Sequence, residues 1–169
     1  MKYLRTPLNE EQLNALNIFE EVIFEGTLYT LRDRTHQKLW SNIQSGKEPF
    51  NLKNSCIYYC GPVFRDKKII SCGPTTSSRM DKFVEFLLKK GVKVMIGKGK
   101  RSPFIGDLCR KYKAVYMITC GGCGAYLAEK IKNFRCVAFP QLGPESIFEL
   151  EVKEFPLVVA IDTKGRSIY

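Results

Sequence analysis

The sequence predicts an α/β fold with a largely parallel sheet, built as a single domain over residues 1–169. Short apolar runs that suit strands alternate with segments of helical periodicity, most regularly after residue 100. Glycine and proline mark the boundaries, as at Gly73-Pro74 and Gly91. The hydrophobic fraction of 44% and the charged fraction of 26% are ordinary for a globular protein, and 169 residues can bury a substantial core.

The N-terminal third predicts short elements. The sequence NEEQLNAL at residues 9–16 predicts a short capped helix. β-branched and aromatic residues flank Glu25-Gly26, so residues 18–30 predict two short strands joined by a turn. LRDRTHQKLW, residues 31–40, predicts a strand-to-helix junction followed by the apolar face of a helix. Residues 44–54 are polar and form a loop too short to separate two domains.

The centre of the chain predicts a strand, a helix and a second strand. CIYYCGPV at residues 56–63 predicts a strand that stops at Gly-Pro. Hydroxyl side chains at residues 75–78 precede a helical pattern that ends at Gly91, and Ser78 with Asp81 resembles a capping box. Residues 92–96 then predict a buried strand before the flexible turn Gly97-Lys98-Gly99.

The C-terminal part continues the alternation of helix and strand. We expect a helix over 104–112, a strand over 114–119, a helix over 124–131, a strand over 136–139, a short helix from Pro144 to Leu150, and a last strand over 157–162.

Charge and cysteine content narrow the function classes. The chain has 27 Lys and Arg against 17 Asp and Glu, a net charge of +10 that suits an acidic partner. The basic residues are spread out, with one local cluster at Lys98, Lys100 and Arg101, whereas a nucleic-acid module more often has a basic run with interleaved aromatics. No apolar run approaches the roughly 20 residues of a membrane helix. The N-terminus lacks the apolar core of a signal peptide, and the odd number of cysteines, 7, favours free thiols in a reducing, cytoplasmic setting.

Polar residues gather where strands are expected to end. Thr75, Thr76 and Arg79 lie between a strand and a helix, whose N-terminus offers free N–H groups to an anion. Lys98 follows the next strand, and in a parallel sheet both turns lie at the same edge, where ligands bind. The pattern is equally that of a well-capped helix between two strands.

The motifs resemble a known family. GPTTSSRMD followed by IGKG, the RDRTH segment, the YYCGP segment and the closing LGPESIFELEVKEFPLVVAID are similar to the beta subunit, or C-terminal domain, of class I fumarate hydratases and L-tartrate dehydratases. The resemblance covers nearly the whole chain. It implies a swivelling β/β/α-type domain, packed on an alpha subunit whose cysteines hold a four-iron four-sulfur cluster. It also implies reversible hydration of fumarate to L-malate, with L-tartrate dehydration as the alternative.

The resemblance also implies a role for each motif residue. Arg32 and Arg79 bind the carboxylates of a dicarboxylate substrate, and Lys98 adds a point charge. Thr75 takes the position of the catalytic base, and Thr76 donates a hydrogen bond to a substrate carboxylate. Asp33 and His36 position Arg32 from behind, although a lone histidine is commonly a structural residue.

CGGC at residues 120–123 has the spacing of half a zinc or redox site. No second CxxC exists, and the only histidine is far upstream, so we expect Cys120 and Cys123 to be small buried residues and the chain to bind no metal itself. A function of another class also remains open, that of a basic module which binds phosphate or nucleic acid. Steeply salt-dependent binding to generic nucleic acid would favour it over a dicarboxylate site.

Overall fold

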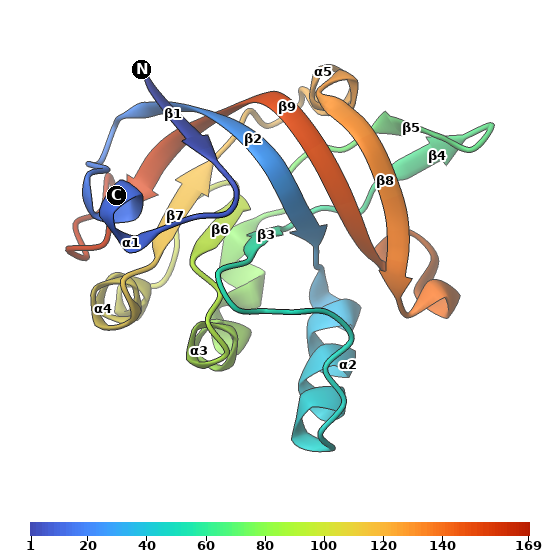
Figure 1. The fold of residues 1–169 in the computed structure, drawn as a ribbon, viewed down its shortest axis with the longest axis horizontal. Coiled ribbons are helices and arrows are strands. Elements are labelled where there is room, and N and C mark those ends of the chain that lie inside the picture. Colours follow the sequence, from blue (N-terminus) through green and yellow to red (C-terminus); the bar gives the residue numbers. More distant parts are fainter.

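The computed structural model describes residues 1–169 and has a single large sheet, with the helices Asp33–Gln44, Asp81–Lys89 and Phe104–Tyr112 on one side of it (Figure 1). Its N-terminal elements are β1 (Lys2–Arg5), α1 (Glu10–Asn14), β2 (Glu21–Thr30) and α2 (Asp33–Gln44). The middle contains β3 (Cys56–Tyr58), β4 (Val63–Arg65), β5 (Lys68–Ser71), the 3₁₀ turn η1 (Ser77–Met80), α3 (Asp81–Lys89) and β6 (Val94–Gly97). The C-terminal elements are α4 (Phe104–Tyr112), β7 (Val115–Ile118), α5 (Gly124–Glu129), β8 (Ile131–Ala138), η2 (Pro140–Glu145) and β9 (Ile147–Ile161).

The large sheet is mixed and closes on itself. Its strand order is β1-β2-β3-β6-β7-β9-β8, and β2 also pairs with β9. Strands β1, β2, β3, β6 and β7 pair in parallel with one another, whereas β9 runs antiparallel to β2, β7 and β8. The expected α/β class is confirmed, and the parallel part of the sheet is confined to its first five strands. The long β9 closes the ring β2-β3-β6-β7-β9.

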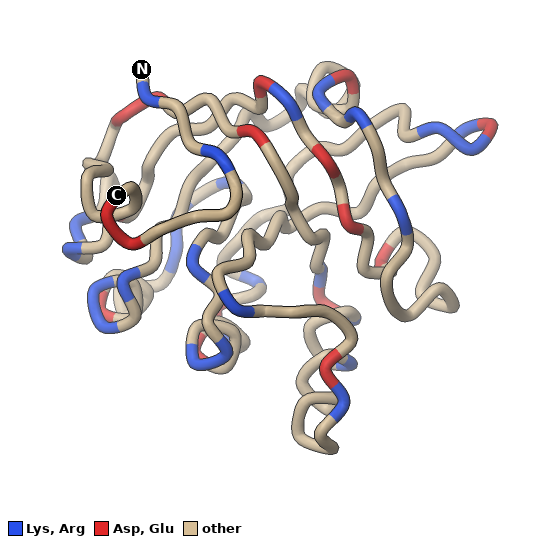
Figure 2. The backbone as a smooth tube through the Cα atoms, in the orientation of Figure 1, with Lys and Arg blue, Asp and Glu red and all other residues tan.

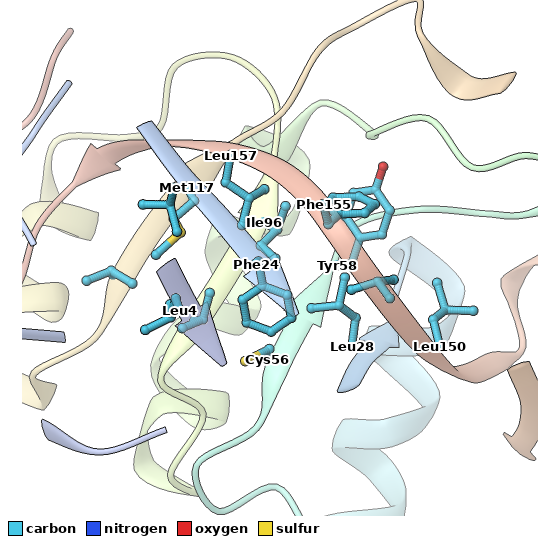
Figure 3. Close-up of a cluster of buried hydrophobic side chains, with 14 of the residues drawn as sticks. Leu4, Phe24, Leu28, Cys56, Tyr58, Ile96, Met117, Leu150, Phe155 and Leu157 are labelled. Atoms are coloured by element: carbon cyan, nitrogen blue, oxygen red, sulfur yellow. The ribbon is translucent and has the colours of Figure 1, made fainter. Parts of the chain in front are cut away.

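Two cores lie on the two faces of this sheet. Inside the ring, 23 buried residues pack together (Figure 3), and outside it 19 more fill the space beneath α2, α3 and α4. Along β3 the side chains alternate between the two cores: Cys56 and Tyr58 face inward, whereas Ile57 faces the helices. Because both faces are covered, these short strands are continuous apolar runs, which is why the sequence identifies them.

Residues 18–30 were expected to form two strands, and this is wrong. Glu21–Thr30 is one strand with a register shift between Phe24 and Gly26. Gly26 has φ of 120°, and a Cβ at this position would lie 1.9 Å from Thr6 Oγ1. The glycine therefore marks a bulge against a neighbouring segment rather than a turn.

The expected short helix up to Leu150 is also wrong in its second half. A 3₁₀ turn ends at Glu145, and β9 begins at Ile147 and runs without interruption to Ile161. Phe148, Leu150 and Val152 are all buried, which is the period-2 pattern of a strand. Pairing with both β2 and β8 stabilises this strand, and such pairing is not visible in the local sequence.

No helix is both long and apolar enough to cross a bilayer. Figure 2 shows Lys and Arg distributed over the helices, the β4–β5 hairpin and several loops, with acidic residues interspersed. The net positive charge is therefore not gathered on one element.

Candidate active site

Parallel strands place the candidate residues at one edge of the sheet. In register, Thr30 of β2 lies beside Tyr58 of β3, and Tyr58 lies beside Ile96 of β6. The chain leaves these strands toward Arg32 and Lys98, so both residues follow carboxyl ends at the same edge.

The threonine segment is attached to this edge by backbone bonds. The Thr75 N–H donates to the Tyr59 carbonyl at 2.6 Å, and Thr76 forms a parallel bridge with Lys98. The Ser77 N–H donates to the Lys98 carbonyl at 3.0 Å, and the Lys98 N–H donates to Ser77 Oγ at 3.1 Å. Thr75 and Thr76 are thus fixed beside Lys98, as the sequence predicts.

The side chains of this segment remain available. Thr75 is partly exposed and Thr76 is exposed, and neither hydroxyl is hydrogen-bonded within the chain. Lys98 is partly exposed and has no ion pair within the chain. These groups can therefore accept or donate bonds to a ligand at the sheet edge.

Arg79 is held by Asp33, the first residue of α2. Arg79 Nε donates to Asp33 Oδ1 at 3.2 Å, and Nη2 donates to Oδ2. This pairing uses one edge of the guanidinium and leaves the Nη1 side free for a second carboxylate. Asp33 was expected to position Arg32, but the structure pairs it with Arg79, because α2 and η1 lie side by side.

Arg32 has a different set of neighbours. Its Nε lies 3.9 Å from Glu145 Oε1 and is buried without a hydrogen-bond partner. Its side chain lies over Gly61, where a Cβ would be 2.9 Å from both Cδ and Nη1 of Arg32. Only glycine leaves room for the guanidinium at this turn. The Gly61-Pro62 turn therefore packs directly against the Arg32 side chain.

His36 is a buried structural residue. Its Nδ1 donates to the Arg32 carbonyl at 2.6 Å, since a carbonyl can only accept, and the ring stacks on Phe83 with centroids 5.2 Å apart. Burial lowers the pKa of His36 to about 4, so the ring is neutral at pH 7. His36 therefore supports the backbone of Arg32 and does not contribute a positive charge.

A buried ion pair, which the sequence does not predict, lies behind the edge. The Arg101 side chain is fully buried, and its Nε donates to Asp81 Oδ1 at 2.5 Å. Asp81 Oδ2 also accepts the Ser102 N–H at 2.8 Å. Asp81 was expected to complete a capping box with Ser78, and this is wrong, because neither η1 nor α3 has a side-chain cap.

Arg101 lies between two tyrosines that contact the site segment. Its guanidinium carbon is 5.2 Å from the Tyr59 ring centroid and 4.8 Å from that of Tyr116. The Tyr116 hydroxyl lies 2.9 Å from both Ser77 Oγ and the Gly99 carbonyl. Arg101, which belongs to the local basic cluster with Lys98 and Lys100 in the sequence, is therefore a core residue beneath the turn that carries Lys98.

Cys120 and Cys123 are exposed, so the expectation that they are buried is wrong. Their loop follows β7 at the same edge, and a Cβ at Gly121 would lie 3.6 Å from Lys98 Cδ. No three His, Cys, Asp or Glu side chains come together in a group that could hold a metal ion. The residues of this chain therefore do not fit as the ligand set of an iron–sulfur cluster.

The candidate residues for substrate binding and catalysis are all at least partly exposed, and they do not line the main cavities. The five main cavities have volumes of 220 to 430 Å³, and none is lined by Arg32, Thr75, Thr76, Arg79 or Lys98. The arrangement therefore supplies cations and hydroxyls at a surface outside these five cavities.

Comparisons with known proteins agree with these motifs. The family model described as "Fumarase C-terminus" matches residues 3–169. The chain is 38% identical over 175 residues to the L(+)-tartrate dehydratase subunit beta of Escherichia coli K12, covering 99% of this chain and 86% of the relative. It is 38% identical over 173 residues to the anaerobic class I fumarate hydratase of the same organism, covering 98% of this chain and 32% of the relative. Fumarate hydratase 2 of Leishmania major is 36% identical over 98% of this chain and 30% of its own length.

Proposed function

Since the chain belongs to the family of fumarase C-terminal domains, we propose that it is the beta subunit of a class I fumarate hydratase that interconverts fumarate and L-malate. In this proposal residues 1–169 act as one domain of the swivelling β/β/α type, in the cytoplasm, on an iron–sulfur alpha subunit. The comparison with a separate subunit beta over 86% of its length supports a two-chain enzyme.

The observation that carries the proposal is the row of cations and hydroxyls at one sheet edge. Fumarate and malate have a carboxylate at each end, so the site needs two separate groups that bind anions. Arg79 offers the guanidinium edge that Asp33 leaves free, which suits two parallel bonds to one carboxylate. Arg32 and Lys98 provide positive charge for the other carboxylate, and Thr76, which forms a backbone bridge with Lys98, provides a hydroxyl donor beside it.

In this proposal Thr75 takes part in the proton step. In the dehydration of L-malate to fumarate, the reaction removes a proton from the CH₂ carbon and the hydroxyl from the neighbouring carbon. The Thr75 hydroxyl has no partner in this chain, and its backbone is fixed by the bond to Tyr59. An alcohol is a weak base, so we propose that Thr75 relays the proton to a stronger base supplied by the partner.

The partner must also supply the electrophile. A four-iron four-sulfur cluster in the alpha subunit would act there as a Lewis acid on the leaving hydroxyl. Within this chain, the tasks are to bind the two carboxylates, to orient the CH₂ group toward Thr75, and to close the site when the subunits pack together.

L-tartrate dehydration is the second candidate, favoured by the long match to an L(+)-tartrate dehydratase subunit beta. Tartrate is also a four-carbon dicarboxylate that loses water across adjacent carbons, so the same cations suit it. The identities of 38% to both relatives do not separate the two substrates.

The experiment is an anaerobic assay of this chain alone, of the iron–sulfur alpha subunit alone, and of the pair, each with fumarate and with L-tartrate. We expect activity only from the pair, and loss of activity in air as an exposed cluster is oxidised. Air-stable hydratase activity from this chain alone would refute the proposal. Activity of the pair on tartrate but not fumarate would replace the first substrate with the second.

A further inference from the structure

Two Cys-Gly-Pro sequences meet beneath the candidate site. Cys60-Gly61-Pro62 follows β3, and Cys72-Gly73-Pro74 follows β5, with the β4–β5 hairpin between them. Cys60 and Pro74 form an antiparallel bridge. The two turns are therefore neighbours in space although they are separated by a protruding hairpin (Figure 1).

The two sulfurs are in direct contact. Cys60 Sγ lies 3.0 Å from Cys72 Sγ, and both residues are buried in the core inside the ring, with exposed fractions of 1% and 0%. A disulfide bond is about 2.05 Å long, so the sulfurs need to approach by only about 1 Å. The Tyr58 hydroxyl donates to the Cys72 carbonyl at 2.5 Å and holds this backbone in place.

We propose that Cys60 and Cys72 are a dithiol pair that forms a reversible intrachain disulfide under oxidising conditions. Hydrogen peroxide is a sufficient oxidant: one thiol becomes a sulfenic acid with release of water. The second thiol then attacks that sulfur, so that the S–S bond forms, the S–O bond breaks and a second water leaves. The two sulfurs lose two electrons in total, which the peroxide accepts, and a small dithiol reductant reverses the change.

The bond would join the two turns that carry the candidate site. Gly61 packs against the Arg32 side chain, and Pro74 directly precedes Thr75. A covalent link one residue before each Gly-Pro unit would therefore restrict how far the Thr75 segment can move relative to Arg32. This inference concerns the chain itself and holds whether or not the proposed hydratase function is correct.

Burial makes the pair slow to react. Burial raises the pKa of the Cys60 thiol well above its usual value, so little thiolate is present at pH 7. The exposed thiols of Cys120, Cys123 and Cys136 should be oxidised first. The link between Cys60 and Cys72 should then accumulate over a longer incubation, while the chain remains folded.

The test is peptide mapping of the full chain after incubation with hydrogen peroxide. The protein is denatured, its remaining thiols are alkylated, and it is digested with trypsin, which separates residues 54–65 from residues 69–79. We expect these two peptides as one species that a reductant splits, with fragmentation that assigns the bond to Cys60 rather than Cys56. Recovery of Cys60 and Cys72 as alkylated thiols, after the exposed cysteines have been oxidised, would overturn the proposal.

Matched variants distinguish a bond between Cys60 and Cys72 from oxidation of the other cysteines. Cys72→Ala should abolish the species, whereas Cys56→Ala and the double variant Cys120→Ser with Cys123→Ser should retain it. Circular dichroism establishes that each variant is folded. Amide hydrogen exchange over residues 73–76 should be slower in the oxidised than in the reduced chain, and this difference should be absent in Cys72→Ala. Equal exchange in both forms would refute the restriction of the Thr75 segment.

Discussion

Replacing Asp81 by alanine tests the buried ion pair behind the site. The Arg101 side chain is 0% exposed and that of Asp81 is 6% exposed, and two guanidinium nitrogens of Arg101 already have no partner. Removing the carboxylate leaves a buried unpaired cation, a loss of about 3–5 kcal/mol. It also leaves the Ser102 N–H without its acceptor, which adds about 1 kcal/mol.

The expected loss of unfolding free energy for Asp81→Ala is therefore about 4–6 kcal/mol. This is a large share of the total unfolding free energy of a typical domain, which is about 5–15 kcal/mol. Chemical denaturation at pH 7 measures it. Asp107→Ala is the matched control, because the Asp107–Arg110 pair is 72% and 64% exposed and should contribute less than about 1 kcal/mol. A loss below about 1 kcal/mol for Asp81→Ala would refute the buried, paired state of Arg101.

The remaining predictions concern His36 and two site residues. Burial lowers the pKa of His36 from 6.5 to about 4, so below pH 6.5 the unfolded chain binds a proton that the folded chain does not. Stability should fall by about 3 kcal/mol between pH 6.5 and 4, measured by denaturation at each pH, and His36→Gln should lack this component; an unchanged slope would contradict it. In the assembled enzyme Arg79→Lys should lower kcat/KM, with a rise of about 2–3 kcal/mol in the corresponding free-energy barrier, since lysine cannot form the paired bonds. A kcat/KM like that of the parent would show that Arg79 does not bind substrate. Thr75→Ala should reduce kcat far more than it changes KM, and parental kcat would exclude Thr75 from the proton step.

The strands that the sequence predicts well are those buried on both faces. Runs such as CIYYC and VMIG are apolar throughout, because one set of side chains enters the inner core and the other packs beneath the helices. The strand β9 was only partly predicted. Its middle contains Glu149, Glu151 and Glu154, which face outward, and its pairing with β2 across the chain decides its length.

The candidate site shows the same division between local and long-range information. Gly-Pro and Gly-Lys-Gly mark the ends of strands, so the placement of Thr75, Thr76 and Lys98 at one edge follows from local sequence. The partners of the charged residues do not. Asp33 and Arg79 are 46 residues apart, and Asp81 and Arg101 are 20 apart, so each pair forms only when the helices pack.

The free cation of the site depends on the buried one. Lys98 and Arg101 are in the same short segment, yet Lys98 is free and Arg101 is enclosed between Tyr59 and Tyr116. Those two tyrosines also bond to the candidate site segments. The Tyr59 carbonyl accepts a hydrogen bond from the Thr75 N–H, and the Tyr116 hydroxyl is hydrogen-bonded to Ser77 and to Gly99, which follows Lys98. Arg101 therefore fixes the two rings whose polar groups hold the threonine segment and the lysine turn together. A buried cation thus sets the spacing of the threonine segment and Lys98, the residues proposed to bind the substrate.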